Sequence, residues 1–386
     1  MNNKIKLIRT STIPGSLRSF CSGMLRELQE KRGYEVVAVS SPGKAMEEIA
    51  AHESVRTAVV PMERHISLRK DIVSLCRMIK LFRREAPTMV HSITPKAGML
   101  SMLAAWLTRV PVRVHTFTGL VFPTSSGLKR RVLMATDWLT CACATHIIPE
   151  GEGVKNDLLR YGITRKPLRV LGYGNIRGVD MEHYSRRPEV MTRAVELRDE
   201  SKITFLFVGR IVRDKGVDEL CEAFARLNAR YPRSRLWLVG AYEDNLDPIS
   251  EQSRHTIQSC AGIEAVGRKS GDELLAYYAA ADCLVCPSYR EGFPNVVLEA
   301  GALGLPSIVT DINGSREIII EGENGTIVSP RDADALHDAM ERMVNDADYR
   351  FALARNARQL VGSRFEQGFV RQCLYDFYDG VLAARG

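Results

Sequence analysis

Two glutamates, Glu291 and Glu299, are the residues of this sequence whose type and spacing most directly suggest chemistry. The apolar run 281–286 before them predicts a buried strand, and from Asn295, a suitable N-cap, the pattern becomes helical. Glu291 is therefore expected in a loop at the carboxyl end of a strand, where open α/β sheets bind ligands, and Glu299 in the first turns of the next helix. Two carboxylates there can accept hydrogen bonds from hydroxyl groups of a ligand. Most glutamate pairs at this spacing have no such role and are simply one carboxylate in a loop and one solvated carboxylate on a helix.

Two cations follow a second predicted strand. The apolar run 203–208 leads into a loop that carries Arg210 and Lys215, at the same sheet edge as Glu291. A guanidinium forms paired hydrogen bonds to phosphate oxygens and an ammonium supplies a point charge, so the two together could bind a diphosphate. Ordinary surface charge accounts for them equally well on composition alone.

Two histidines and a glycine mark the first half of the chain. His91 and His115 are expected near the carboxyl ends of strands 88–92 and 112–117. A lone histidine is more often structural, but two at corresponding strand ends favour a site. Gly15 lies in a small-residue loop between a strand and a helix, where backbone N–H groups can approach a phosphate; a plain connecting loop is equally consistent.

Other motifs do not predict sites. Asp332-Ala333-Asp334 and Asp346-Ala347-Asp348 have the spacing of metal ligands, but they lie on or beside polar helices and are interpreted as solvated carboxylates. Cys283 and Cys286 have a redox-like spacing inside an apolar strand, which predicts two packed thiols. The glycines of 172–178 lack the spacing of a dinucleotide fingerprint.

Strand and helix patterns alternate through both halves of the 386-residue chain, which is too long for one ordinary core. A single helix is expected over 17–31, and the last strand of the first half over 168–171. The alternation predicts an α/β protein with two doubly wound domains, residues 1–180 and 181–363, that face one another across a cleft.

The charge is divided unequally between the halves. Residues 1–180 hold 28 Lys and Arg against 14 Asp and Glu, a formal charge of +14, whereas 181–386 hold 25 against 32, a charge of −7. A basic first half indicates an anionic partner, either nucleic acid or a membrane surface with an anionic lipid substrate. Aromatic residues are too few and dispersed there for base stacking, so no nucleic acid is expected. The basic face of the helix predicted over 68–85 is either solvated or a membrane-surface patch.

The sequence predicts a cytoplasmic protein with peripheral contact to the inner membrane face. No apolar run is long enough to cross a bilayer, and the N-terminal residues lack the pattern of a signal peptide. The nine cysteines are scattered, which is typical of a reducing compartment.

These motifs together resemble the retaining, nucleotide-sugar-dependent glycosyltransferases of family 4, the group 1 glycosyltransferases with the GT-B fold. The resemblance covers nearly all of the second half and is looser in the first. In the second half it rests on Gly209-Arg210, Lys215-Gly216, 287–299 with its E-x7-E pair, 314–317, Gly322 and Gly325; in the first it rests on Gly15, 91–98, 115–119 and 172–180. These segments resemble those of bacterial enzymes that build capsule, exopolysaccharide or O-antigen repeat units on a lipid carrier.

The resemblance implies two Rossmann-like domains, the second of which holds most of the nucleotide, and a last helix, 364–386, that crosses back to the first. Arg210 and Lys215 would bind the diphosphate, Glu299 the ribose hydroxyls and Glu291 the donor sugar. His115 would lie beside the transferred sugar, Gly15 would approach the phosphate, and Arg268 would lie beside the base, expected to be uracil. Backbone groups would line the remaining pocket, namely those of Gly292, Phe293, Asn295, Val296, Val297 and Leu298.

The implied activity is retaining transfer of a hexosyl or N-acetylhexosaminyl group from a UDP-sugar to a hydroxyl of a lipid-linked glycan, without cofactor or metal. The segment 150–152, Glu-Gly-Glu, departs from the family, whose members often carry a serine there. Two alternatives remain open: a nucleotide-sugar epimerase of the same architecture, and a non-catalytic nucleotide-sugar binder.

Overall fold

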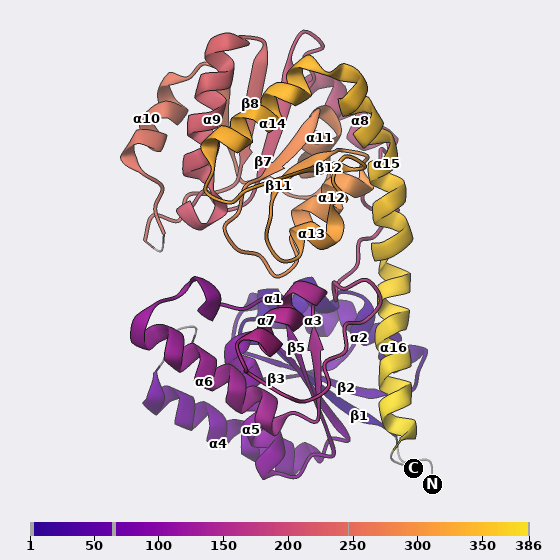
Figure 1. Ribbon diagram of the computed structural model, residues 1–386. Coiled ribbons are helices and arrows are strands. Elements are labelled where there is room, and N and C mark those ends of the chain that lie inside the picture. The colour runs from indigo at the N-terminus through magenta and orange to yellow at the C-terminus, as the bar shows by residue number, and fades with distance from the viewer. Residues whose placement is uncertain (1–3, 64–66, 246, 385–386) are drawn as a thin grey trace. The chain divides into compact units, whose positions relative to one another are not determined.

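The computed structural model describes residues 4–63, 67–245 and 247–384, and these form two compact units (Figure 1). Unit 1 comprises Met1–Arg177 and Val370–Gly386, and unit 2 comprises Gly178–Phe369. Each unit contains a six-stranded sheet whose strand pairs are all parallel, with helices on both faces. The predicted α/β class with two doubly wound sheets is confirmed.

The sheet of unit 1 has the order β3-β2-β1-β4-β5-β6. Its strands are β1 (Lys6–Thr10), β2 (Glu35–Ser40), β3 (Arg56–Val59), β4 (Met89–Ile93), β5 (Val112–Phe117) and β6 (His146–Pro149). Its helices are α1 (Pro14–Cys21), α2 (Met24–Glu30), α3 (Lys44–Glu53), α4 (Leu68–Glu85), α5 (Pro95–Leu107), α6 (Gly127–Cys143), α7 (Glu152–Arg160) and most of α16 (Gln367–Ala383), with the 3₁₀ turn η1 (Phe122–Thr124). Successive strand residues face opposite cores: Leu7 packs with α1–α3 and α16, and Ile8 with α4–α7.

The single helix expected over 17–31 is wrong, because the chain breaks it into α1 and α2 at Gly23. Gly23 has a φ of 72°, a left-handed conformation that glycine adopts at little cost. The buried carboxylate of Glu53 caps the new helix end, accepting hydrogen bonds from the N–H groups of Gly23 at 2.6 Å and Arg26 at 3.2 Å. Because Glu53 belongs to α3, the sequence around Gly23 does not predict this cap.

The strand expected over 168–171 is also wrong. Leu168 forms one isolated bridge to Ile147 of β6 and the pairing ends there. Gly172 and Gly174 both have positive φ values, 54° and 90°, and turn the chain away from the sheet edge.

The buried hydroxyl of Tyr378 ties α16 to the centre of the unit 1 sheet. It accepts a hydrogen bond from Arg9 Nη1 at 3.2 Å and lies 2.6 Å from His91 Nδ1. The other ring nitrogen of His91 lies 2.7 Å from Thr116 Oγ1. Burial, with the charge of Arg9, holds the pKa of His91 well below its usual value, so this histidine is a neutral part of the core.

The sheet of unit 2 has the order β12-β11-β10-β7-β8-β9. Its strands are β7 (Ile203–Val208), β8 (Ser234–Val239), β9 (Ile263–Gly267), β10 (Cys283–Cys286), β11 (Ser307–Thr310) and β12 (Gly325–Val328). Its helices are α8 (Pro188–Leu197), α9 (Val217–Arg230), α10 (Glu251–Ser259), α11 (Gly271–Ala280), α12 (Asn295–Ala302), α13 (Ser315–Ile318), α14 (Ala333–Asn345) and α15 (Ala347–Phe365), with the 3₁₀ turn η2 (Arg213–Lys215). Strand β12 is absent from the sequence-based prediction.

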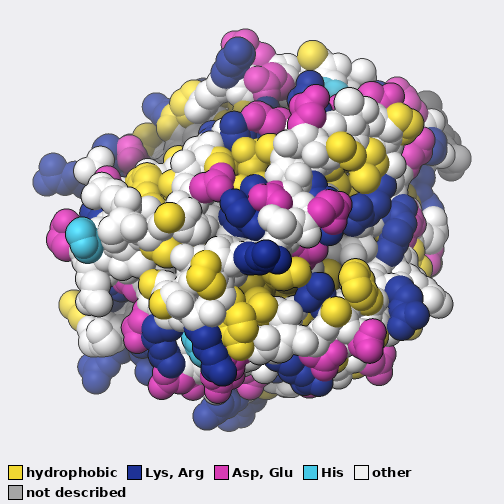
Figure 2. Space-filling model, turned by 90° about the horizontal axis from the view of Figure 1, so that it is seen from above, with side chains coloured by type: hydrophobic (Ala, Val, Ile, Leu, Met, Phe, Trp, Pro, Cys, Tyr) yellow, Lys and Arg dark blue, Asp and Glu magenta, His cyan; other side chains and the backbone are white. Residues whose placement is uncertain are grey.

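The two cysteines of β10 lie in different cores of unit 2, Cys283 with α9 and α14, Cys286 with α11 and α12. They therefore face opposite sides of the sheet, and the prediction of packed thiols is confirmed. Burial raises the pKa of the Cys286 thiol to about 11. On the face of the molecule drawn in Figure 2, side chains of both charges are interspersed with hydrophobic ones.

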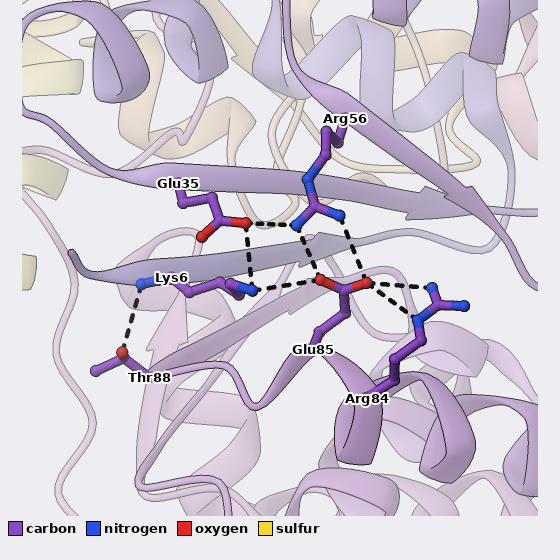
Figure 3. Close-up of polar contacts among 6 residues, drawn as sticks. All are labelled: Lys6, Glu35, Arg56, Arg84, Glu85 and Thr88. Atoms are coloured by element: carbon purple, nitrogen blue, oxygen red, sulfur yellow. Dashed lines mark hydrogen bonds and ion pairs between the residues drawn. The ribbon is translucent and has the colours of Figure 1, made fainter. Parts of the chain in front are cut away.

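A charged cluster joins the amino ends of β1, β2 and β3 in unit 1 (Figure 3). Glu85, the last residue of α4, pairs with Arg56 at 2.8 Å, Arg84 at 3.1 Å and Lys6 at 3.4 Å. Arg56 and Lys6 also pair with Glu35, at 2.5 and 3.2 Å. The hydrogen bond from Arg56 is the main reason that the pKa of Glu85 falls to about 2.

We expect Glu85→Gln to lower the free energy of unfolding at pH 7 by about 1–2 kcal/mol, a value reduced for solvent screening of these partly exposed cations. Because the pKa of folded Glu85 lies below its ordinary 4.5, its contribution is present above pH 4.5 and is lost as the pH falls towards 2. Urea unfolding from pH 7 to pH 2 should therefore show the wild-type and variant curves converging. Glu48→Gln, at an exposed pair with Arg18, is the control and should change little; a difference for Glu85→Gln that is independent of pH would contradict the assignment.

Candidate active site

A cavity of about 300 Å³ lies at the carboxyl ends of β7 and β10 in unit 2. Six residues predicted for the site line it, together with neighbours that were not predicted. The lining residues are Phe207, Val208, Gly209, Arg210, Lys215, Cys286, Ser288, Glu291, Phe293, Pro294, Asn295 and Val296. A larger cavity of about 880 Å³, between the end of α12 and α15, contains none of the predicted residues.

Lys215 and Glu291 form an ion pair in this cavity, and both side chains are mostly buried, 21% and 17% exposed. Burial by itself would lower the pKa of Lys215, but the nearby carboxylate of Glu291 outweighs it and the pKa is raised. The ammonium is therefore charged at neutral pH, and a cation is in place before any ligand binds.

Ser288 orients the carboxylate of Glu291 and was given no role from the sequence. Its hydroxyl donates to Glu291 Oε1 at 2.9 Å, and its carbonyl accepts a hydrogen bond from Thr310 Oγ1 at the end of β11. The serine is buried, 1% exposed, so its hydroxyl has a fixed direction. Ser288 lies three residues before Glu291 in the same loop, and this spacing was the one feature of the sequence that could have indicated the hydrogen bond.

Arg210 follows β7 and lines the same cavity, about half exposed. Its Nη1 pairs with Glu243 Oε2 at 2.8 Å. An exposed ion pair of this kind contributes little stability and exchanges readily for a better anion. Arg210 and Lys215 therefore present two positive charges to one cavity, as the sequence predicted.

Glu299 lies one turn into α12, and its side chain is buried. The N-cap of α12 is Pro294, so the prediction that Asn295 caps this helix is wrong and Asn295 is its first residue. Pro294 has an extended backbone, with φ −75° and ψ 99°, and the helix begins at the residue after it. The side chains of Val297 and Leu298 are buried in the core and not in the cavity.

Two glycines hold the loop 287–294 against neighbouring backbone. A Cβ atom at Gly216 would lie 2.0 Å from the carbonyl oxygen of Pro287, and one at Gly314 would lie 2.3 Å from that of Gly292. Both glycines have left-handed φ values, 69° and 77°. The loop that carries Glu291 therefore has its position set by close backbone contact on two sides.

The remaining predicted residues do not line this cavity. Arg268 is exposed after the edge strand β9. Gly15 and His115 belong to unit 1, and Gly15 lies in the first turn of α1, not in the loop that was expected. His115 is buried, with Nδ1 2.8 Å from Ser92 Oγ and its ring directly over Gly98. Burial lowers the pKa of His115 to about 3, so it is neutral.

The two D-x-D motifs are helix caps. Asp332 accepts a hydrogen bond from the N–H of Ala335 at 2.8 Å, and Asp346 accepts one from Tyr349 at 2.8 Å. Aspartate is a favoured N-cap, so the two motifs mark the starts of α14 and α15.

Comparison with known proteins agrees with this arrangement. Residues 191–360 match the family model of glycosyl transferases group 1, and residues 18–174 match that of the glycosyl transferase 4-like domain. The capsular polysaccharide biosynthesis glycosyltransferase CapM of Staphylococcus aureus is 30% identical over 357 residues, 92% of each chain. The chain belongs to the group 1 glycosyltransferases.

A second relative of this glycosyltransferase is an Escherichia coli enzyme, UDP-Gal:alpha-D-GlcNAc-diphosphoundecaprenol alpha-1,3-galactosyltransferase, 28% identical over 81% of each chain. Among solved structures, HepE of Anabaena in complex with UDP superposes with a TM-score of 0.79 at 16% identity, over 98% of this chain and 100% of HepE. HepE and its structural neighbours have the GT-B fold, so the predicted fold is confirmed. The predicted family is confirmed by the two family models and by CapM.

We expect this glycosyltransferase to bind UDP, and we expect Gly216→Ala to weaken that binding roughly tenfold or more, because the new methyl group would displace the loop that carries Glu291. Gly322→Ala is the matched control, since Gly322 has a similar φ of 75°, but no atom of the described chain beyond its two sequence neighbours lies within 4 Å of the position that its Cβ would take. The left-handed backbone should cost each variant about 1 kcal/mol of stability, and Gly216→Ala should lose more because of its backbone contact; thermal unfolding measures both losses. Equal UDP affinity in the two variants, measured by calorimetry, would contradict the role of this backbone contact.

Proposed function

We propose that this glycosyltransferase moves a hexosyl or N-acetylhexosaminyl group from a UDP-sugar to a hydroxyl of a lipid-linked glycan, with retention of the anomeric configuration, in the synthesis of a bacterial surface polysaccharide. The observation that carries the proposal is the convergence of Arg210, Lys215 and Glu291 on one cavity of unit 2. The names of the relatives support it: CapM acts in capsule synthesis, and the Escherichia coli relative takes UDP-galactose as donor and a sugar on diphosphoundecaprenol as acceptor.

The two cations are suited to a diphosphate. Lys215 is held as a charged ammonium by Glu291, and Arg210 can exchange its exposed partner Glu243 for phosphate oxygens. The N-terminus of α12 begins among the same lining residues and favours negative charge there. Because these groups supply the positive charge that a metal ion would otherwise supply, we propose a reaction without metal or cofactor.

Glu291 is placed to bind the donor sugar. Among the described residues, Lys215 and Ser288 both contact its Oε1, and Oε2 is proposed to accept hydrogen bonds from sugar hydroxyls. Glu299 would accept those of the ribose, and the exposed Arg268 would flank the uracil. The roles proposed for Gly15 and His115 belong to unit 1, where His115 is neutral and can act as a hydrogen-bonding group but not as a cation.

In the reaction, the bond between the anomeric carbon and the diphosphate oxygen breaks while the acceptor oxygen bonds to that carbon. Negative charge develops on the departing diphosphate, where Arg210 and Lys215 stabilise it, and pre-placed charges of this kind are commonly the largest contribution to catalysis. The departing phosphate oxygen accepts the proton of the acceptor hydroxyl. Attack then occurs from the face that the diphosphate leaves, which retains the configuration.

Incubation with a UDP-sugar distinguishes this function from its alternatives. We expect UDP to be released only when a polyprenyl-diphosphate-linked sugar is added as acceptor. Conversion of the UDP-sugar alone into an isomer would identify an epimerase, and tight UDP binding with no turnover of any donor and acceptor would identify a non-catalytic binder.

We expect Lys215→Ala to reduce turnover roughly 10²–10³-fold, because the departing diphosphate loses its fixed cation. Lys202→Ala, which removes a lysine paired with Asp199 just before β7 at the opposite sheet edge, should leave turnover unchanged. Steady-state UDP release measures both variants. Near-normal turnover of Lys215→Ala would contradict the assignment.

We also propose that unit 1 docks on the anionic inner face of the membrane through α4, α5 and α6. In unit 1, α5 is in contact with both α4 and α6. These helices expose large apolar side chains: Leu68, Ile72, Val73, Trp106, Leu107, Leu128 and Trp138. They also expose the cations Arg69, Arg77, Lys80, Arg83, Lys129 and Arg131. Apolar insertion with flanking cations is the pattern of interfacial binding. None of the described helices has both the length and the hydropathy needed to cross a bilayer.

The double variant Arg77→Ser, Lys80→Ser should reduce binding to vesicles that contain phosphatidylglycerol, by roughly fivefold for each cation removed at low salt. Added salt should reduce the wild-type binding in the same direction. Arg355→Ser, at an exposed arginine of unit 2, is the control and should not change it. Cosedimentation that responds neither to lipid charge nor to salt would contradict the docking surface.

A further inference from the structure

Two tyrosine hydroxyls hold the carboxylate of Glu299, one on each oxygen. Tyr184 Oη donates to Oε1 at 2.9 Å, and Tyr278 Oη donates to Oε2 at 3.2 Å. The two tyrosines come from different segments of unit 2, Tyr184 from the chain before α8 and Tyr278 from α11. Neither was singled out by any motif in the sequence.

Each tyrosine is itself fixed. Tyr278 is completely buried in the core between α11 and α12. Tyr184 is held through its backbone, because Arg358 of α15 donates to its carbonyl at 2.9 Å and to that of Met181 at 2.8 Å. A carboxylate that receives hydrogen bonds from two fixed donors has little freedom to rotate.

Tyr278 orients this carboxylate as a neutral hydrogen-bond donor. Burial, together with the negative charge of Glu299, holds the pKa of Tyr278 well above its ordinary value, so the hydroxyl stays protonated and remains a donor. A carboxylate oxygen can accept more than one hydrogen bond, so an oxygen that accepts from a tyrosine hydroxyl can also accept from a ribose hydroxyl. Two neighbouring hydroxyls of a ribose match a pair of carboxylate oxygens that is held in a fixed orientation.

We propose that Tyr184 and Tyr278 are positioning residues that orient the carboxylate of Glu299 to receive both ribose hydroxyls, and so set the preference for a ribonucleotide donor. This inference rests on the proposed function, in which Glu299 binds the ribose. The tyrosines act through Glu299 and need not touch the nucleotide.

The test compares the affinities of UDP and 2′,3′-dideoxy-UDP by calorimetry, and the quantity of interest is their ratio. The wild-type protein should prefer UDP, and Glu299→Gln should abolish most of the preference. Tyr184→Phe and Tyr278→Phe should each reduce it by roughly fivefold or more, the effect of losing one hydrogen bond to a charged acceptor. Tyr277→Phe is the matched control, because it removes a hydroxyl from the neighbouring residue of α11. The ring of Tyr277 packs against Trp237, so this variant should leave the ratio unchanged.

The ratio separates a positioning role from a structural one. If the tyrosine variants bind both nucleotides more weakly but keep the wild-type ratio, the hydroxyls only support the fold and the inference is wrong. If Glu299→Gln itself keeps the ratio, the ribose assignment in the proposed function fails, and the inference with it. Should Tyr278→Phe fail to fold, Tyr184→Phe, at a side chain that is only partly buried, decides the outcome.

Discussion

The ion pair between Lys215 and Glu291 is the interaction on which the rest of the site depends. Removing two charges from water costs free energy, and a mostly buried pair recovers it only when the geometry is good and the remaining hydrogen-bonding capacity is used. Here Ser288 supplies a further hydrogen bond to the carboxylate, and the backbone of the loop is fixed. The result is a cation that is already in place before a diphosphate arrives and a carboxylate with one oxygen left for a sugar.

Close backbone approach makes this pair possible. Lys215 lies at the end of η2, and Gly216 after it touches Pro287, so the two loops that carry the opposite charges meet through their main chains. Gly314 allows the same close backbone approach on the other side of the loop, against Gly292. Glycine is therefore needed at these positions because two backbones meet there. The close contact fixes the distance between Lys215 and Glu291.

Much of the fold and the charged part of the site could be predicted, because both depend on local patterns. Apolar runs followed by helical periodicity place Arg210, Lys215 and Glu291 at the carboxyl ends of parallel strands, and parallel strands bring those ends to one sheet edge. The membership of the chain in its family follows from the same residues.

The features that were not predicted depend on partners far away in the sequence. Glu53 caps a helix whose N-cap, Gly23, lies thirty residues earlier, and Tyr184 reaches Glu299 across 115 residues of sequence. Pattern identifies which side chains could act, but only the folded contacts show which of them are held in position.

A crystal structure of the protein with UDP bound tests the central claim most directly. We predict the diphosphate within hydrogen-bonding distance of both Arg210 and Lys215, with Arg210 released from Glu243 and the ribose hydroxyls on Glu299. A diphosphate bound elsewhere in unit 2, with the Arg210–Glu243 pair intact, would contradict the assignment of this cavity as the nucleotide-sugar site.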